Sequence, residues 1–243
     1  NSTADVFVHD LGNGTTTRVS IASDGAQANH QSTTSSISAA GRIVTYQSLG
    51  STLVPGDTNA LNDVFVHDRD TGTTTRVSVG TDGTQASSGA GGPTISANGR
   101  FVLFSSGAAL TEPDTNSTSD VFVHDLESRT TTRISDSGTG AEGNNSSVAS
   151  SISSDGRYVA YESVASNLVP GDTNQLADVF VQDRTTGLTT RISLTSAGRQ
   201  ASYISYDPAL SSDGSVVAFA SDAPLMPGDS NGIADVFVFE PFA

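Results

Sequence analysis

The tetrapeptide Asp-Val-Phe-Val occurs five times in this chain, and its spacing constrains the fold more than any other feature. The copies begin at Asp5, Asp63, Asp120, Asp178 and Asp235, which are 58, 57, 58 and 57 residues apart. A fixed period of this length is typical of one supersecondary unit that is repeated and buries its apolar face against its neighbours. We therefore expect a single domain over residues 1–243, with repeats starting near the first four copies and a partial fifth copy from the last.

Each period contains four short runs with the composition of β-strands, which we call a, b, c and d. In the second period they cover residues 94–97, 100–105, 120–125 and 130–135. Strands a and b are joined by an Asn-Gly or Asp-Gly turn in three periods, and this dipeptide between two apolar runs is the strongest short signal for a β-hairpin. No segment shows helical periodicity. The pattern predicts an all-β fold, a β-propeller of four-stranded antiparallel blades.

The strand count leaves the number of blades open. The chain begins with a c–d pair, continues through three complete sets and ends with strands a, b and c. Four blades are favoured, with the N-terminal c–d pair closing the ring against the last a–b pair, because closure removes open strand edges. The strand over residues 235–239 is then in surplus. It can replace the strand that begins at Asp5, lie as an extra edge strand, or pair with a neighbouring molecule by strand addition. A truncated five-bladed chain is the alternative, since residues 1–5 align with residues 116–120.

The motifs of the third period resemble those of a known repeat family. Ser151-Ile-Ser-Ser-Asp-Gly-Arg-Tyr-Val-Ala-Tyr is followed by Asp178-Val-Phe-Val-Gln-Asp and then by Thr189-Thr-Arg-Ile-Ser. In this order they resemble the TolB-type, WD40-like propeller repeats, and the likeness covers essentially the whole chain. The resemblance implies the propeller fold. It does not select a function, because propellers of this kind serve as binding platforms, accessory domains and enzyme lids.

The charge of the chain narrows the range of its partners. It has 26 acidic and 11 basic residues, and its net charge is −15. A chain this acidic repels nucleic acid and anionic lipid at ordinary salt, so we expect no nucleic-acid partner. No apolar run is long enough to span a membrane, so we expect no membrane insertion. Cations, neutral glycans and other proteins remain, and the proteins include a second copy of this chain.

The N-terminus bears on the location of the protein. The first residue is Asn rather than Met, and we expect a processed product. The expected location is secreted or at the cell surface, with the periplasm as the alternative. The chain has no cysteine, so disulfides are excluded and the redox compartment cannot be read.

An acidic loop with the pattern Asp-x-Asn-x-x-x-Asp ends at the Asp of four Asp-Val-Phe-Val copies. Two carboxylates and an amide oxygen in one loop can wrap a hard cation, with backbone carbonyls and water as further ligands. Ca²⁺ suits such a loop better than Mg²⁺, which requires tighter octahedral geometry. The candidate ligands are Asp57, Asn59 and Asp63; Asp114, Asn116 and Asp120; Asp172, Asn174 and Asp178; and Asp229, Asn231 and Asp235. The alternative is that Asp and Asn form Asx-turns that shape these loops and cap strand c.

Two sets of recurring residues in strands c and d have simpler interpretations. Histidine occupies one position of strand c in three repeats, at His9, His67 and His124. We expect these side chains to pack between blades, because equivalent positions are rotated away from each other around a propeller axis. Strand d repeats Arg18, Arg76, Arg133 and Arg191, and strand c ends in Asp10, Asp68, Asp125 and Asp183. These residues are expected to form cross-strand or inter-blade ion pairs.

The loops between strands d and a are a candidate ligand face. They repeat a polar side chain at Gln27, Gln85, Glu142 and Gln200. Repeated amides at one end of a propeller would suit sugar hydroxyls, whereas ordinary solvated loops are the alternative.

No catalytic motif accompanies these repeats. The sequence has no Gly-x-Ser-x-Gly elbow, no His-Glu-x-x-His and no phosphate-binding loop. We therefore expect a non-enzymatic, extracellular, calcium-binding propeller that acts as a structural or assembly module. The alternatives are a carbohydrate- or peptide-binding platform, and a propeller accessory to a hydrolase.

Overall fold

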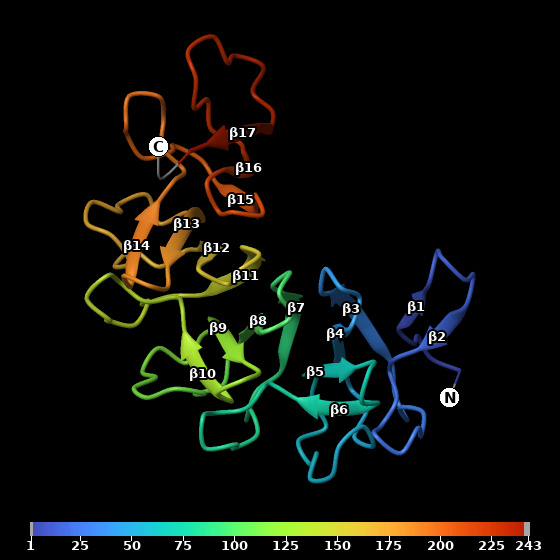
Figure 1. Ribbon diagram of the computed structural model, residues 1–243. Helices are drawn as coiled ribbons and strands as arrows, with labels where there is room; N and C mark the ends of the chain where they lie inside the picture. The colour runs from blue at the N-terminus through green and yellow to red at the C-terminus, as the bar shows by residue number, and fades with distance from the viewer. Residues whose placement is uncertain (1, 241–243) are drawn as a thin grey trace. The chain divides into compact units, whose positions relative to one another are not determined.

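The computed structural model describes residues 2–240, and its secondary structure there consists of 17 β-strands without any helix (Figure 1). No helix of a length and hydrophobicity that would cross a membrane is found in this range. The strands lie in five sheets, of which three have four strands. The prediction of an all-β chain made of four-stranded antiparallel units is confirmed.

In every complete sheet the strands are hydrogen-bonded in the order in which they follow each other along the chain. The first complete sheet contains β3 (Ser32–Ile37), β4 (Ile43–Ser48), β5 (Asp63–Asp68) and β6 (Thr73–Arg76). The second contains β7 (Ala90–Ile95), β8 (Phe101–Ser106), β9 (Asp120–Asp125) and β10 (Thr130–Arg133). The third contains β11 (Ser147–Ile152), β12 (Tyr158–Ser163), β13 (Asp178–Asp183) and β14 (Leu188–Arg191). At the ends of the chain, β1 (Phe7–His9) pairs with β2 (Thr16–Arg18), and β15 (Ser205–Leu210), β16 (Val217–Ser221) and β17 (Asp235–Phe239) form a three-stranded sheet.

The chain divides into two compact units. Unit 1 comprises residues 1–111 and 123–132, and unit 2 comprises residues 112–122 and 133–243. Strands β1 to β8 belong to unit 1 and β11 to β17 to unit 2, whereas β9 and β10 contribute residues to both. Each unit contains a hydrophobic cluster of its own.

Strand a of the second complete sheet is longer than predicted. β7 begins at Ala90, four residues before the apolar run that the sequence shows. The register between β7 and β8 shifts between Gly91 and Thr94, which marks a β-bulge. Gly92 lies inside the bulge with a φ of 63°, a conformation that glycine adopts without strain. The apolar run is therefore only the half of the strand that follows the bulge.

Strand c supplies the core of unit 1. All but the last residue of β5 are buried, and Phe65 stacks on Tyr46 with ring centroids 6.0 Å apart. The other side of this aromatic pair is covered by Val6 and Val19 from the β1–β2 sheet. Neighbouring sheets in unit 1 therefore join through valines of one sheet and aromatic rings of the next.

The same junction recurs in unit 2. Phe180 of β13 stacks on Tyr161 at 5.7 Å. Val179 and Val181 point to the opposite side of β13 and lie in one cluster with Phe219 and the partly buried Phe237 of the next sheet. Alternation along β13 thus places aromatic and branched side chains on its two faces, and both faces are buried.

The last strand of the chain has a partner in its own sheet. β17 pairs with β16 in antiparallel register, with Phe219 opposite Phe237. The expectation that the N-terminal c–d pair closes against the last a–b pair is therefore not met, because β17 occupies the edge of β16 that such closure requires. The predicted order of strands is kept, and β17 acts as strand c of the last sheet.

Candidate metal centre

The predicted acidic loops place their two aspartates together in both units, just before strand c. In the loop before β5, Asp57 and Asp63 are almost fully enclosed, with side-chain exposures of 3% and 0%. Asp172 and Asp178 have the same exposures in the loop before β13. Burial raises the pKa of Asp63 and of Asp172, because a carboxylate loses solvation when it is enclosed.

A glutamine from the following d–a loop closes two of these sites. Gln85 donates from Nε2 to Asp57 Oδ1 at 2.9 Å and to Asp63 Oδ2 at 3.1 Å. An isolated β-bridge to Val79 holds the glutamine in this position. In unit 2, Gln200 repeats the two bonds at 2.7 and 3.1 Å. The amide hydrogens lie between the carboxylates, where a bound cation would otherwise lie.

The asparagine of the loop acts mainly on the backbone. Asn59 Oδ1 accepts a hydrogen bond from the Leu61 amide at 3.0 Å, which is an Asx-turn. Its Nδ2 group donates to Asp63 Oδ2 at 3.3 Å and to the Ala86 carbonyl at 3.0 Å. Asn174 forms the equivalent set of bonds in unit 2. In both loops the amide nitrogen, rather than the predicted ligand oxygen, faces the carboxylate.

The arginine of strand d balances part of the negative charge of the acidic loop. The prediction that it pairs with the aspartate at the end of strand c is therefore wrong. The register of β5 and β6 sets Arg76 opposite the middle of β5 and Asp68 opposite the first residue of β6, so the two charges lie apart. Arg76 Nη1 instead lies 3.5 Å from Asp57 and 3.6 Å from Asp63. Asp68 accepts two bonds from Arg42, at 3.0 and 2.6 Å, which lower its pKa to about 2.

The loop before β9 departs from this pattern at one residue. Glu142 stands where the other repeats have glutamine, and an isolated β-bridge to Asp136 holds it in place. Oxygens of Asp114, Asp120 and Glu142 lie within 4.8 Å of one another. The position that Gln85 and Gln200 fill with amide hydrogens is thus lined by a third carboxylate.

The predicted ligand Asn116 is engaged elsewhere. Its Oδ1 accepts a hydrogen bond from the Thr118 amide at 2.6 Å, and its Nδ2 donates to the Gly143 carbonyl at 2.6 Å. The structure therefore brings Asp114 and Asp120 of the predicted set together, adds Glu142 and leaves the amide outside.

One oxygen of this cluster has no hydrogen-bond partner in the part of the chain that the structure describes. Asp120 is 1% exposed, and its Oδ1 accepts from Ser135 Oγ at 2.6 Å, but its Oδ2 accepts no hydrogen bond. Arg133 Nη1 lies 3.8 Å from that oxygen and 3.2 Å from Glu142 Oε1. Burial and the two neighbouring carboxylates raise the pKa of Asp120 to about 6. One guanidinium against three carboxylates leaves a net charge that a divalent cation would match.

The fourth predicted loop is more open. Asn231 donates to Asp235 Oδ2 at 3.1 Å and accepts from the Ile233 amide at 3.1 Å. Asp229 and Asp235 are half-buried, and Asn231 is exposed. No ion pair to this loop is found among residues 2–240.

Solved structures identify the architecture. A putative TolB from Agrobacterium tumefaciens matches 97% of this chain and 65% of its own, with a TM-score of 0.56 and 16% identity. The β-propeller domain of the Trilobed protease from Pyrococcus furiosus matches 98% of this chain and 59% of its own, with a TM-score of 0.55 and 10% identity. An oligogalacturonate lyase in complex with manganese matches 99% of this chain and 57% of its own, with a TM-score of 0.56 and 14% identity.

The chain has a TolB-like β-propeller fold. No family model and no curated protein matches the sequence. The chain spans less than two thirds of the length of each of the three structures, and at these identities the likeness establishes the fold alone.

The recurring histidines of the propeller bond to threonines of strand d. His67 Nδ1 lies 2.9 Å from Thr74 Oγ1, and His124 Nδ1 lies 2.9 Å from Thr131 Oγ1. Both rings are 5% exposed, and burial lowers the pKa of each. These contacts give His67 and His124 the expected packing role, whereas His9, whose Nδ1 lies 2.8 Å from Thr16 Oγ1, is exposed.

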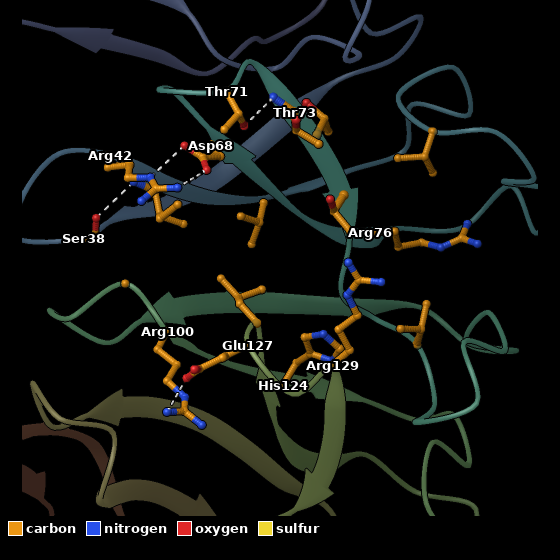
Figure 2. A pocket seen from close by; sticks show the side chains of 18 of the residues that line it. Ser38, Arg42, Asp68, Thr71, Thr73, Arg76, Arg100, His124, Glu127 and Arg129 are labelled. Atoms are coloured by element: carbon orange, nitrogen blue, oxygen red, sulfur yellow. Dashed lines mark hydrogen bonds and ion pairs between the residues drawn. The ribbon is translucent and has the colours of Figure 1, made fainter.

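A groove of about 1310 Å³ lies in unit 1, and Asp114, Asp120 and Glu142 are not among the residues that line it. Figure 2 shows Arg42 with Asp68 on one side and Arg100 with Glu127 on the other. These charges pair within the protein, since Arg42 binds Asp68 at 2.6 Å and Arg100 binds Glu127 at 2.5 Å. The groove therefore offers apolar and hydroxyl-bearing walls between neutralised ion pairs.

The predicted sugar-binding amides are not on a free face of this propeller. Gln85 uses Nε2 for its two aspartates, and its Oε1 lies 3.3 Å from the Thr58 amide. Gln200 makes the equivalent contact with Thr173. Both side chains therefore help to hold the b–c loop.

We predict that the stability of the protein depends on pH because of a second position in unit 2 at which one repeat differs from the others. Gln182 replaces the recurring histidine and donates to Asp136 Oδ1 at 2.6 Å, while burial raises the pKa of Asp136 to about 6. The folded chain keeps the proton of Asp136, while the unfolded chain loses it near pH 4. The contribution of Asp136 to the free energy of unfolding should therefore fall by about 1–2 kcal/mol between pH 4 and 6. Denaturation in the presence of chelator should show a shallower fall for Asp136→Asn. An unchanged slope would show that Asp136 does not titrate in this way.

Proposed function

We propose that this chain is a non-enzymatic β-propeller module stabilised by calcium at Asp114, Asp120 and Glu142, and that it serves binding or assembly outside the cell. The observation that supports the site is the buried Asp120 Oδ2. It accepts no hydrogen bond from residues 2–240, lies 3.8 Å from Arg133 Nη1 and faces two further carboxylates. A buried, unpaired carboxylate oxygen is costly unless a proton or a cation binds it.

The chemistry of the cluster favours calcium. All three ligands are carboxylates, and hard divalent cations prefer oxygen ligands. Asp114 and Glu142 are half-buried, and three carboxylates from two loops suit the irregular shell that Ca²⁺ accepts and Mg²⁺ does not. Three protein carboxylates suit the weak affinity of extracellular calcium modules, which agrees with the expected secreted, cell-surface or periplasmic location.

The proposed centre keeps two of the twelve predicted ligands and adds one. Calcium at the other ten predicted ligands is not part of this proposal. For the loops of Asp57 and Asp172, the amide hydrogens of Gln85 and Gln200 already satisfy the facing carboxylate oxygens. The proposed centre therefore lies in the repeat in which Glu142 replaces the glutamine of the neighbouring repeats.

Thermal unfolding tests this assignment. Calcium at about 100 times its dissociation constant should stabilise the protein by about 2.7 kcal/mol, a rise in Tm of roughly 5–10 °C over the chelated protein. Glu142→Gln should lose this rise, and its Tm in chelator should exceed that of the wild type because the amide supplies the missing donors. Asp229→Asn, in the open fourth loop, is the matched control and should keep the full rise. A full rise in Glu142→Gln, or none in the wild type, would rule out the centre.

The groove of unit 1 supports a second candidate function, a peptide-binding platform. Its walls carry Thr73, Thr75, Val66 and Val79, and no phenylalanine, tyrosine or tryptophan lines it, so they suit an extended peptide better than a stacked sugar. Thr75 is an exposed residue of these walls, and Thr75→Arg should abolish capture of peptides from a random library. Capture that survives this variant would exclude the groove.

An accessory role beside a hydrolase is the remaining alternative. It rests on one similar structure, which is the propeller domain of a protease. A reading frame that joins this propeller to a catalytic domain would favour this role over the free-standing module.

A further inference from the structure

Two strands, β1 in unit 1 and β17 in unit 2, expose side chains whose equivalents are buried in every complete sheet. Val236 and Val238 of β17 are 75% and 67% exposed. The equivalent valines of β13 are Val179 and Val181, and both are 0% exposed. β17 thus has the sequence and register of an inner strand c, but one of its faces is open to solvent.

The inner junctions show which chemistry covers such a face. In unit 2, Val179 and Val181 pack in one cluster with Phe237, the phenylalanine of the next strand c. In unit 1, Val6 and the partly buried Val8 pack in one cluster with Phe65, again from the next strand c. In both units the valine face of one sheet is therefore covered by the phenylalanine face of the sheet that follows.

A phenylalanine face of this kind is open on β1. Phe7 is 53% exposed, whereas its equivalents Phe65 and Phe180 are 0% exposed. The Arg18 guanidinium lies over the Phe7 ring at 5.5 Å and is itself 36% exposed. The chain therefore displays both halves of the junction that it builds internally, one on β1 and the other on β17.

We propose that the valine face of β17 binds the Phe7 face of β1 in a second copy of this chain. The contact is heterologous, since each copy uses a different face, and it leaves one face of each kind free for a further copy. It is a face-to-face packing of sheets and does not require the strand addition expected from the sequence. The inference rests on the proposed assembly role but not on the calcium centre.

Mixing of single-face variants tests this arrangement. In the full chain with calcium, sedimentation should show a mass that rises with concentration. Val238→Asp and Phe7→Asp should each weaken association about tenfold or more, because each buries a charge in an apolar contact. An equimolar mixture of the two variants should form a heterodimer and nothing larger, because only one intact junction can form. Association that survives Phe7→Asp, or a wild type that stays monomeric at all concentrations, would overturn the proposal.

Cross-linking covers the case in which an aspartate variant does not fold. The chain has no cysteine, so introduced thiols report a single contact. Val238→Cys mixed with Phe7→Cys should give a heterodimeric disulfide under mild oxidation, and neither variant alone should cross-link. Cross-linking of Val238→Cys with itself would show a symmetric contact and contradict the head-to-tail one. Glu142→Gln should associate like the wild type, so failure of this proposal can be distinguished from failure of the calcium centre.

Discussion

Replacing Arg76 with methionine is expected to lower the free energy of unfolding by about 3–5 kcal/mol. The substitution keeps the bulk of the side chain but leaves Asp57 and Asp63 without their guanidinium, and both carboxylates are enclosed. Breaking a buried ion pair on one side is costly because the remaining charge cannot return to water. Urea denaturation at pH 7 measures the loss.

Arg18 provides the matched control for this prediction. It holds the same repeat position, but its side chain is 36% exposed, and it pairs with one carboxylate rather than two, that of Asp5 at 3.5 Å, which is 6% exposed. Arg18→Met should therefore cost less than about 1 kcal/mol. The cost of Arg76→Met should also be smaller at pH 5 than at pH 7, because protonation relieves the uncompensated carboxylates. Equal losses in the two variants would show that the enclosed carboxylates do not depend on the arginine.

The second large effect is expected from Gln200→Glu, which builds a three-carboxylate cluster where the repeat has an amide. In chelator the variant should lose about 3–5 kcal/mol, because two hydrogen bonds to buried carboxylates disappear and a third negative charge is added. Calcium should restore most of this stability, since the new cluster has the same three ligand types as the natural one.

Gln200→Leu separates charge from lost hydrogen bonds. It removes the same two donors without adding a carboxylate, so it should be less destabilising than Gln200→Glu in chelator. Calcium should raise the stability of Gln200→Leu by no more than it raises that of the wild type. If calcium rescues neither variant, three carboxylates in this loop are not sufficient to bind the ion.

The fold could be predicted from the sequence because the same turn and strand patterns recur in every repeat. The turn at Asn98-Gly99 fixes a hairpin, and the Val-Phe-Val run fixes a strand with two buried faces. The predictions that were wrong concern features that depend on the register between paired strands. The bulge beside Gly92 lengthened strand a, and the pairing of β5 with β6 moved Arg76 away from Asp68.

The acidic centre was only half predictable for a similar reason. Asp114 and Asp120 share one loop, so their spacing shows that they can meet. Glu142 lies beyond two further strands, β9 and β10, and it reaches the loop only because a bridge with Asp136 folds the d–a loop back. One signal in the sequence could have found Glu142. It is the only acid at a repeat position that is otherwise glutamine, in Gln27, Gln85 and Gln200.

The number of calcium ions bound per chain tests the account most directly. Titration calorimetry on the chelator-treated protein should give one ion for the wild type, none for Glu142→Gln and two for Gln200→Glu. These values follow if a third carboxylate, rather than the Asp-x-Asn-x-x-x-Asp loop itself, makes a repeat bind calcium. Four ions per wild-type chain, or one ion that persists in Glu142→Gln, would contradict the account.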